Sequence, residues 1–197
     1  LVIAVTGSSG KTTTRRIIET LIGGDRAIRT GVRNFNNDIG LPLTVFTLEE
    51  GDEVLLLEMG MNHAGELLRL AEIARPSMVV VTNIGSAHIE FLGSREGIAA
   101  AKKEALSFFD DSCTAILNTN DEFYEYLADG IRGRILGFGA VPENFSVVSD
   151  DGLSGYVLGW AGGQTRFALG GAHNLTNLAA GTVVARELGL AESVIAA

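Results

Sequence analysis

Three short runs of this chain are apolar at every position: "LVIAV" at 1–5, "VLLL" at 54–57 and "MVVV" at 78–81. A strand with one face in water alternates apolar and polar residues, whereas a strand covered on both faces is apolar throughout. Helix-like segments separate these runs. The alternation predicts the α/β class, with a mostly parallel, doubly wound sheet between two layers of helices.

The expected elements follow this alternation as far as residue 138. We expect strands near 1–6, 26–30, 53–58, 78–82, 114–118 and 134–138, and helices near 11–22, 40–48, 64–74, 94–108 and 121–129. After residue 138, the short runs "FSVVSD", "GYVLGW" and "QTRFALG" are separated by turn residues, which predicts a small antiparallel sheet. We therefore divide the chain into a parallel core (1–138), a small antiparallel sheet (139–170) and returning helices (171–197).

Composition narrows the classes of partner. The 197 residues carry a formal net charge of -9. Such an acidic surface repels nucleic acid and anionic membranes, so we expect neither as a partner. The lone Cys113 cannot form an internal disulfide, which favours a reducing, cytoplasmic setting. The chain starts at Leu1 inside a strand-like run and shows no signal or membrane-spanning segment, so we expect an interior piece of a longer protein.

The first apolar run leads directly into "TGSSGKTTT" at 6–14. Gly7 and Gly10 permit a tight turn that brings backbone N–H groups close to a phosphate, and a helix starting at Lys11 points its N-terminus at the same anion. Lys11 would neutralise phosphate charge, and the Thr12 hydroxyl could bind Mg²⁺. The common phosphate loop has a glycine where Val5 stands, so this is a shortened variant. The alternative is a strand-to-helix turn capped by serine.

Glu58 ends the strand-like run "EVLLLE". Enzymes with phosphate loops need an acidic residue at such a position to hold Mg²⁺, directly or through water. The alternative is a carboxylate that is solvated at the end of a strand.

Two further segments contain candidate polar groups. "NIGSAHIEFLGS" places Asn83, His88 and Glu90 in one loop, although histidine is a less usual magnesium ligand than oxygen. In "SREGIAAAKKEALSFF", helical spacing puts Lys102 on the apolar stripe and Lys103 beside it. A lysine on a buried stripe is costly unless it has a task or extends its ammonium to water.

A pair of asparagines begins the last helical segment. Asn174 and Asn177 lie one helical turn apart in "AHNLTNLAAG". Asparagine is a favoured helix cap. Since only one of the two can cap the helix, we expect the other to be available for a ligand.

Together these segments resemble the central domain of the Mur ligases, the ATP-dependent amide-bond-forming enzymes that also include the folylpolyglutamate synthases. The resemblance covers essentially the whole chain, in order, and the shortened loop is the form found in that family. It rests on the following motifs: "TGSSGKTTT", "NFNNDIGLPLT", "EMGMNHAGE", "TNIGSAHIEFLGS", "AKKE" and "GAHNLTNLAAG".

The resemblance implies ATP and Mg²⁺ as cofactors and assigns a role to each matching residue. ATP phosphates would be bound by the loop and the residues after it, namely Gly7, Ser8, Ser9, Gly10, Lys11, Thr12 and Thr13. Thr12 and Glu58 would hold one magnesium, and Glu58, His88 and Lys102 would serve a second one. Lys102 matches a lysine that the family carbamylates, and Lys11, Lys102 and His88 would be catalytic.

The remaining implied roles concern the base of the nucleotide and the substrates. Asn174 or Asn177 would bind adenine, and Asn36, Asn37, Asn62 and His63 would line the path to a UDP-muramoyl-peptide. The motifs look most like the family member that joins D-Ala-D-Ala to this peptide through an acyl phosphate. Family members usually have an N-terminal and a C-terminal domain that are absent from these residues, so we expect the chain alone to be inactive.

Three alternatives remain open. The first is another Mur ligase or a folylpolyglutamate synthase, because substrate identity lies largely in the flanking domains. The second is a GTP-binding switch, since "NTND" at 118–121 partly matches the guanine-reading N-K-x-D, with Thr119 in place of the lysine. The third is a nucleotide-binding domain without catalytic activity.

Overall fold

The computed structural model describes residues 1–31 and 35–197. In these residues six parallel strands form one sheet in the order β2-β3-β1-β4-β5-β6. The strands are β1 (Val2–Thr6), β2 (Ile28–Thr30), β3 (Val54–Glu58), β4 (Met78–Val81), β5 (Thr114–Asn118) and β6 (Arg134–Phe138). β1 lies inside the sheet. The chain first places β2 at one edge and β3 between β2 and β1, and it then adds β4, β5 and β6 in turn on the other side of β1. This is the doubly wound arrangement expected from the sequence.

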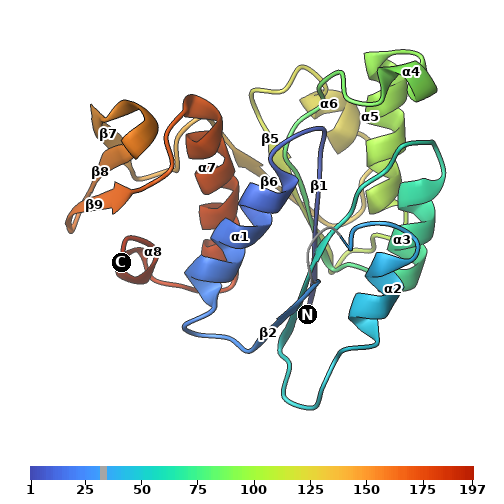
Figure 1. The fold of residues 1–197 in the computed structure, drawn as a ribbon, viewed down its shortest axis with the longest axis horizontal. Coiled ribbons are helices and arrows are strands. Elements are labelled where there is room, and N and C mark those ends of the chain that lie inside the picture. Colours follow the sequence, from blue (N-terminus) through green and yellow to red (C-terminus); the bar gives the residue numbers. More distant parts are fainter. Residues whose placement is uncertain (32–34) are drawn as a thin grey trace.

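Helices cover both faces of this sheet, as Figure 1 shows. α1 (Lys11–Ile22) and α7 (Ala172–Glu187) lie side by side on one face, where Ile3 and Val5 pack against them. The opposite face, which includes Ala4, is covered by α2 (Gly40–Val45), α3 (Glu66–Ala74), α5 (Arg95–Lys103) and α6 (Tyr124–Ala128). Alternate residues of β1 therefore enter two separate hydrophobic clusters.

A second sheet stands beside α7, away from the parallel sheet (Figure 1). It contains β7 (Ser146–Asp150), β8 (Tyr156–Trp160) and β9 (Gly163–Phe167), all antiparallel. Tyr156 and Leu158 on β8 pack with Leu175 and Leu178 of α7. The short elements α4 (Ile89–Leu92), η1 (Glu104–Leu106), η2 (Gly152–Ser154) and α8 (Glu192–Ile195) complete the described chain.

The fold class and the expected strands are confirmed, and the differences lie at the ends of helices. The helix expected over 94–108 ends at Lys103 and continues as the 3₁₀ turn η1, while those expected over 40–48 and 121–129 are shorter. The short helix α4 was not expected from the sequence pattern. Within the described chain, no helix has both the length and the apolar character needed to cross a membrane.

Candidate functional site

The loops that carry the candidate residues meet at the carboxyl edge of the parallel sheet. β1 pairs with β3 on one side and with β4 on the other, so the loops after Thr6, Glu58 and Val81 are neighbours. The direction of chain winding reverses about β1, and such a switch point is where open α/β sheets bind ligands.

The loop after β1 requires glycine at both of its predicted glycine positions. Gly7 has φ 144° and Gly10 has φ 79°, a region that disfavours other residues. A Cβ atom on Gly7 would lie 1.8 Å from the Thr82 hydroxyl, and one on Gly10 would lie 2.4 Å from Oδ1 of Asn177. The loop is therefore packed closely against β4 on one side and α7 on the other.

Hydrogen bonds to the loop after β4 hold the two serines. The Ser9 amide donates to Oδ1 of Asn83 at 3.2 Å, and the Asn83 amide group donates back to the Ser9 carbonyl at 3.1 Å. The Gly85 amide donates to the Ser8 hydroxyl at 2.8 Å. No side chain caps α1 within the described residues, so the alternative of a serine-capped turn is not formed. The two serines instead order the loop through their bonds to Asn83 and Gly85.

The charged groups of the loop face β3. Lys11 Nζ donates to the Gly7 carbonyl at 3.0 Å and curls back over the loop. Burial lowers the pKa of Lys11, and the negative charge of Glu58 partly opposes that shift. The Thr12 hydroxyl donates to Oε2 of Glu58 at 2.8 Å, while Nδ2 of Asn36 donates to Oε1 at 3.0 Å. Glu58 is thus not a solvated strand end, because both of its oxygens are engaged.

Lys102 and Lys103 lie in different environments, as the helical phase predicts. Lys102 is 2% exposed, and burial together with the positive charge of Lys11 lowers its pKa to about 7. Lys103 instead donates to the carbonyls of Tyr126 and Asp129 at 2.7 Å each. Lys102 is therefore almost entirely buried, whereas Lys103 connects α5 to the end of α6.

His88 lies at the start of α4 with φ 67° and is half-buried. Within residues 1–31 and 35–197, no group of three or more His, Cys, Asp and Glu side chains could hold a metal ion. A metal site at this edge would thus need the Thr12 hydroxyl, Glu58 and oxygens from elsewhere.

The expectation that one asparagine caps α7 is wrong. Gly171 occupies the N-cap position, and no described side chain caps the helix there. Asn177 is 5% exposed and accepts from the Thr14 hydroxyl at 3.2 Å, while its amide donates to Asn174 at 3.2 Å. Asn174 is half-buried and donates to the Gly170 carbonyl at 2.8 Å. The Asn177 side chain is therefore bonded to Thr14 of α1 and does not cap its own helix.

The four residues predicted to contact a substrate separate into two groups. Asn36 reaches Glu58, and Asn37 accepts from the Gly40 amide at 2.8 Å at the start of α2. Asn62 and His63 are exposed before α3, where His63 Nδ1 lies 2.9 Å from Oε1 of Glu66. The motif that contains Asn36 and Asn37 begins at Asn34, which lies outside the described residues.

Two residues that order the site were missed. The Thr82 hydroxyl donates to the Ser9 carbonyl at 2.6 Å, and Thr14 links α1 to Asn177. Polar residues directly after the apolar run "MVVV" were the available signal for Thr82. Their partners could not be identified because these contacts join loops far apart in the sequence.

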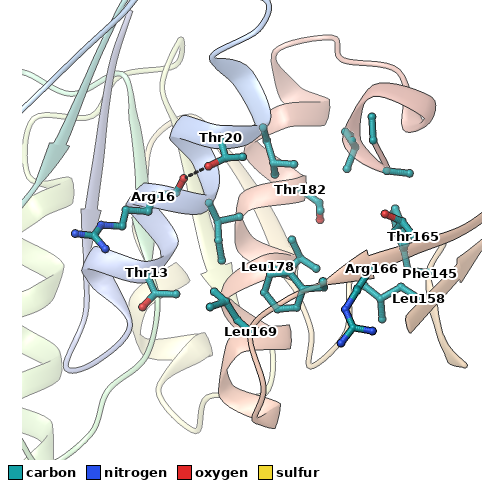
Figure 2. A pocket seen from close by; sticks show the side chains of 16 residues that line it. Thr13, Arg16, Thr20, Phe145, Leu158, Thr165, Arg166, Leu169, Leu178 and Thr182 are labelled. Carbon is teal, nitrogen blue, oxygen red and sulfur yellow. Dashed lines mark hydrogen bonds between the residues drawn. The ribbon is translucent and has the colours of Figure 1, made fainter. Parts of the chain in front are cut away.

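A separate cavity of about 460 Å³ lies between α1, α7 and the small sheet (Figure 2). Its walls are mostly apolar, with Ile17, Phe145, Leu158 and Leu178 among the lining residues. Of the predicted nucleotide-binding residues in the described chain, only Thr13 lines it. The cavity therefore adjoins the loop without containing the Lys11–Glu58 cluster.

Comparisons with known proteins agree on one family. The family described as the Mur ligase middle domain matches residues 5–185. The UDP-N-acetylmuramoyl-tripeptide–D-alanyl-D-alanine ligase of Treponema pallidum (strain Nichols) is 33% identical over 189 residues, which is 95% of this chain and 41% of the relative.

Solved structures show the same similarity. The chain aligns with MurF from Acinetobacter baumannii at a TM-score of 0.83 and 28% identity, covering 99% of this chain and 44% of that one. It aligns with MurF ligase from Thermotoga maritima in complex with ADP at a TM-score of 0.81 and 31% identity, covering 100% and 48%. The chain thus spans less than half the length of these relatives.

Proposed function

Because this chain belongs to the Mur ligase family through its middle domain, we propose that it supplies the ATP-binding site of a peptide ligase of peptidoglycan precursor synthesis. The ligase would join D-Ala-D-Ala to UDP-N-acetylmuramoyl-tripeptide, the activity for which the compared relative is named. The observation that supports the proposal best is the pairing of Thr12 with Glu58 next to a glycine loop that holds Lys11.

The proposed reaction has two steps. A carboxylate oxygen of the tripeptide attacks the γ-phosphorus of ATP, and the bond to the bridging oxygen breaks, giving an acyl phosphate and ADP. The amine of D-Ala-D-Ala then attacks the acyl carbon, phosphate leaves, and the amine loses a proton as the amide forms. No nucleophile from the protein is needed, so positioning and charge neutralisation carry the catalysis.

The loop and the first turn of α1 suit a polyphosphate. The first turn of α1, from Lys11 to Thr13, presents backbone N–H groups at a helix N-terminus, where an anion is stabilised. The Lys11 ammonium lies at the loop and would neutralise charge that develops on the transferred phosphoryl group. Asn83 and Thr82 hold the loop in a fixed conformation through hydrogen bonds to the Ser9 carbonyl before a nucleotide binds.

The Thr12–Glu58 pair fits one magnesium ion. Octahedral Mg²⁺ binds oxygen at about 2.1 Å, which puts neighbouring ligand oxygens about 3 Å apart. The oxygens of Thr12 and Glu58 lie 2.8 Å apart. When bound, such an ion would reduce the negative charge of the nucleotide phosphates. Asn36 would hold the other Glu58 oxygen in place.

We propose that Lys102 is carbamylated and, with His88 and Glu58, serves a second magnesium. A neutral lysine amine attacks CO₂, giving a carbamate and a proton released to solvent. Carboxylate-like oxygens are what Mg²⁺ prefers, whereas an ammonium repels it. The buried position of Lys102 and its lowered pKa of about 7 favour the neutral amine that this reaction requires.

The base and the substrates would be bound around this centre. Asn174 or Asn177 would contact adenine, and the half-buried Asn174 is the more accessible of the two. Asn36, Asn37, Asn62 and His63 would line the approach of the muramoyl-peptide. Flanking N-terminal and C-terminal domains of a longer cytoplasmic protein would bind the UDP-sugar and the amino substrate, with residues 1–138, 139–170 and 171–197 as parts of the middle domain.

A specific contact counts against the GTP-binding switch. In such switches the aspartate of N-K-x-D reads guanine, but here both Asp121 oxygens accept backbone bonds, from Ile84 at 2.7 Å and Phe123 at 3.0 Å. Another ligase of the same family remains the second candidate, because fewer than half of the relatives' residues are compared.

Calorimetric titration with Mg-ATP and Mg-GTP tests the nucleotide assignment, and we expect binding of ATP only. Equal binding of GTP would contradict the proposal. Product formation from UDP-N-acetylmuramoyl-tripeptide, D-Ala-D-Ala and Mg-ATP tests the reaction. We expect the protein with its flanking domains to form the amide and residues 1–197 alone to fold, bind nucleotide weakly and form none.

A further inference from the structure

The Thr6 hydroxyl is a buried polar group without a partner. Thr6 is the last residue of β1 and is 0% exposed. Its Oγ1 has no hydrogen bond within the described part of the chain. A buried hydroxyl without a partner destabilises a fold, and most such groups in proteins are hydrogen-bonded. Its position directly before the phosphate loop makes it a candidate for contact with a group bound at the site.

The pairing of β1 with β4 shows which face Thr6 occupies. In register, Ala4 is opposite Val79 and Thr6 is opposite Val81. Ala4, Val79 and Val81 all belong to the cluster on the α5 face. Because strand side chains alternate, Thr6 projects to that same face and not toward α1.

Lys102 approaches the same place from α5. The α5 helix begins at the carboxyl edge of the sheet, where Arg95 in its first turn donates to the Ile84 carbonyl at 2.8 Å. Side chains of a helix lean toward its N-terminus, so the Lys102 side chain extends toward that edge. The charge of Lys11 also acts on Lys102, and Lys11 is bonded to Gly7, the residue after Thr6.

Thr6 and Lys102 are therefore two buried polar residues that approach the same edge of the sheet from β1 and α5. Lys102 is 2% exposed, and the described residues supply no hydrogen bond or ion pair to its ammonium. A direct bond between Lys102 and Thr6 is not formed either, since Thr6 has no described partner. A group added to the lysine nitrogen would bring oxygen atoms into this region.

We propose that Thr6 is a positioning residue that donates a hydrogen bond to a carbamate on Lys102. This inference rests on the proposed carbamylation of Lys102. The lysine nitrogen forms a bond to the carbon of CO₂, one C=O π bond becomes a C–O⁻, and the nitrogen releases a proton to solvent. A hydroxyl–carboxylate hydrogen bond is short and charge-assisted. It would fix the rotation of the carbamate and hold its other oxygen toward the metal.

The test follows the carbamate directly, without using activity. The full chain is incubated with ¹³C-bicarbonate at pH 8, and the carbamate carbon is detected by NMR as bicarbonate is increased. Thr6→Val keeps the branched shape and removes the donor, while Thr6→Ser keeps the donor. Thr114→Val is the matched control, since Thr114 is a buried threonine at the amino edge of the same sheet. Lys102→Ala identifies the signal.

We expect Thr6→Val to need about tenfold more bicarbonate for half-occupancy, the loss of one charge-assisted bond. Thr6→Ser and Thr114→Val should titrate like the wild type. Thermal unfolding gives a second readout. Without CO₂, Thr6→Val should be at least as stable as the wild type, and adding bicarbonate should stabilise the wild type more than the variant.

The two proposals fail in different ways. Equal titration of Thr6→Val and the wild type would overturn the role of Thr6 and leave carbamylation intact. A wild type with no signal that depends on Lys102 would overturn carbamylation, and the role of Thr6 with it. A Thr6→Val variant that is less stable than the wild type without CO₂ would show that the hydroxyl has a structural partner, which also contradicts the inference.

Discussion

The two sides of the phosphate loop differ in whether their polar groups have hydrogen-bond partners within the protein. On the side of the loop itself and α7, Thr14 is hydrogen-bonded to Asn177, and Ser8 and Ser9 are hydrogen-bonded to Gly85 and Asn83 in the loop after β4. On the side toward α5, the buried Thr6 hydroxyl has no hydrogen-bond partner in the described chain, and Lys102 is buried with no described ion-pair partner. The first side is organised before any ligand binds, and the second has the features of a site that awaits an added group.

This difference has a physical meaning for how a ligase would work. A preorganised loop binds phosphate without the cost of ordering the loop at that moment. A buried lysine without a counter-charge instead destabilises the fold until it is neutralised or modified. We therefore assign nucleotide binding to the preorganised loop and the chemical step that follows to the side that contains Lys102.

The largest effect should come from Lys102→Ala in the protein with its flanking domains. We expect amide formation to fall by about 10²–10³-fold, the usual effect of removing one group that stabilises charge at a reacting centre. Partial rescue by a small carboxylic acid should follow, because it returns an anion to the vacated position. Lys103→Ala is the control and should leave the rate unchanged, since its ammonium is bonded to α6. Greater sensitivity at Lys103 would contradict the assignment.

Lys102→Met should raise the free energy of unfolding in buffer free of CO₂. Burial lowers the pKa of folded Lys102 to about 7, while an unfolded lysine titrates near 10.5. Between these pH values the unfolded state binds more protons, so wild-type stability rises with pH. Below pH 7 the full cost of the buried ammonium remains, and there the variant should gain on the order of 5 kcal/mol. Chemical denaturation of the wild type and the variant at pH 6 and at pH 10 measures the gain in free energy of unfolding at each pH. An equal gain at pH 6 and pH 10 would contradict this account.

Lys11→Ala should weaken Mg-ATP binding by on the order of 50-fold, because it removes a charged donor from the phosphate site. The fold should survive, since the hydrogen bond that the Lys11 ammonium makes in the described part of the chain is to the Gly7 carbonyl in the loop. Calorimetric titration gives the affinity, and circular dichroism checks the fold. Arg16→Ala, on the next turn and exposed, is the matched control. An unchanged ATP affinity in Lys11→Ala would contradict the assignment of residues 6–14 as a phosphate-binding loop.

Glu58→Gln should have a smaller and more selective effect. The amide keeps the shape of the side chain but loses the charge that Mg²⁺ prefers. We expect ATP affinity to fall about tenfold with Mg²⁺, 1.4 kcal/mol, and to change little without it. Equal losses in both conditions would mean that the bonds to Thr12 and Asn36 make Glu58 a structural residue.

The strands and the burial of Lys102 could be predicted because both depend on periodicity along the chain. Continuous apolar runs located β1, β3 and β4, and helical phase separated Lys102 from Lys103. The role of Asn177 was missed because its bonds to Thr14 and its contact with Gly10 join α7 to α1 across the fold. Likewise, Thr6 looked like an ordinary strand residue until its lack of a partner was visible.

The most direct measurement of the difference between the two sides is ATP affinity with and without CO₂. The full chain is titrated calorimetrically with Mg-ATP in buffer equilibrated with CO₂ and in buffer stripped of it. Because the phosphate side is already hydrogen-bonded, we predict the same affinity in both buffers and in Lys102→Ala. A loss of about tenfold, or 1.4 kcal/mol, on stripping CO₂ would show that the two sides bind nucleotide as one unit, and would contradict this account.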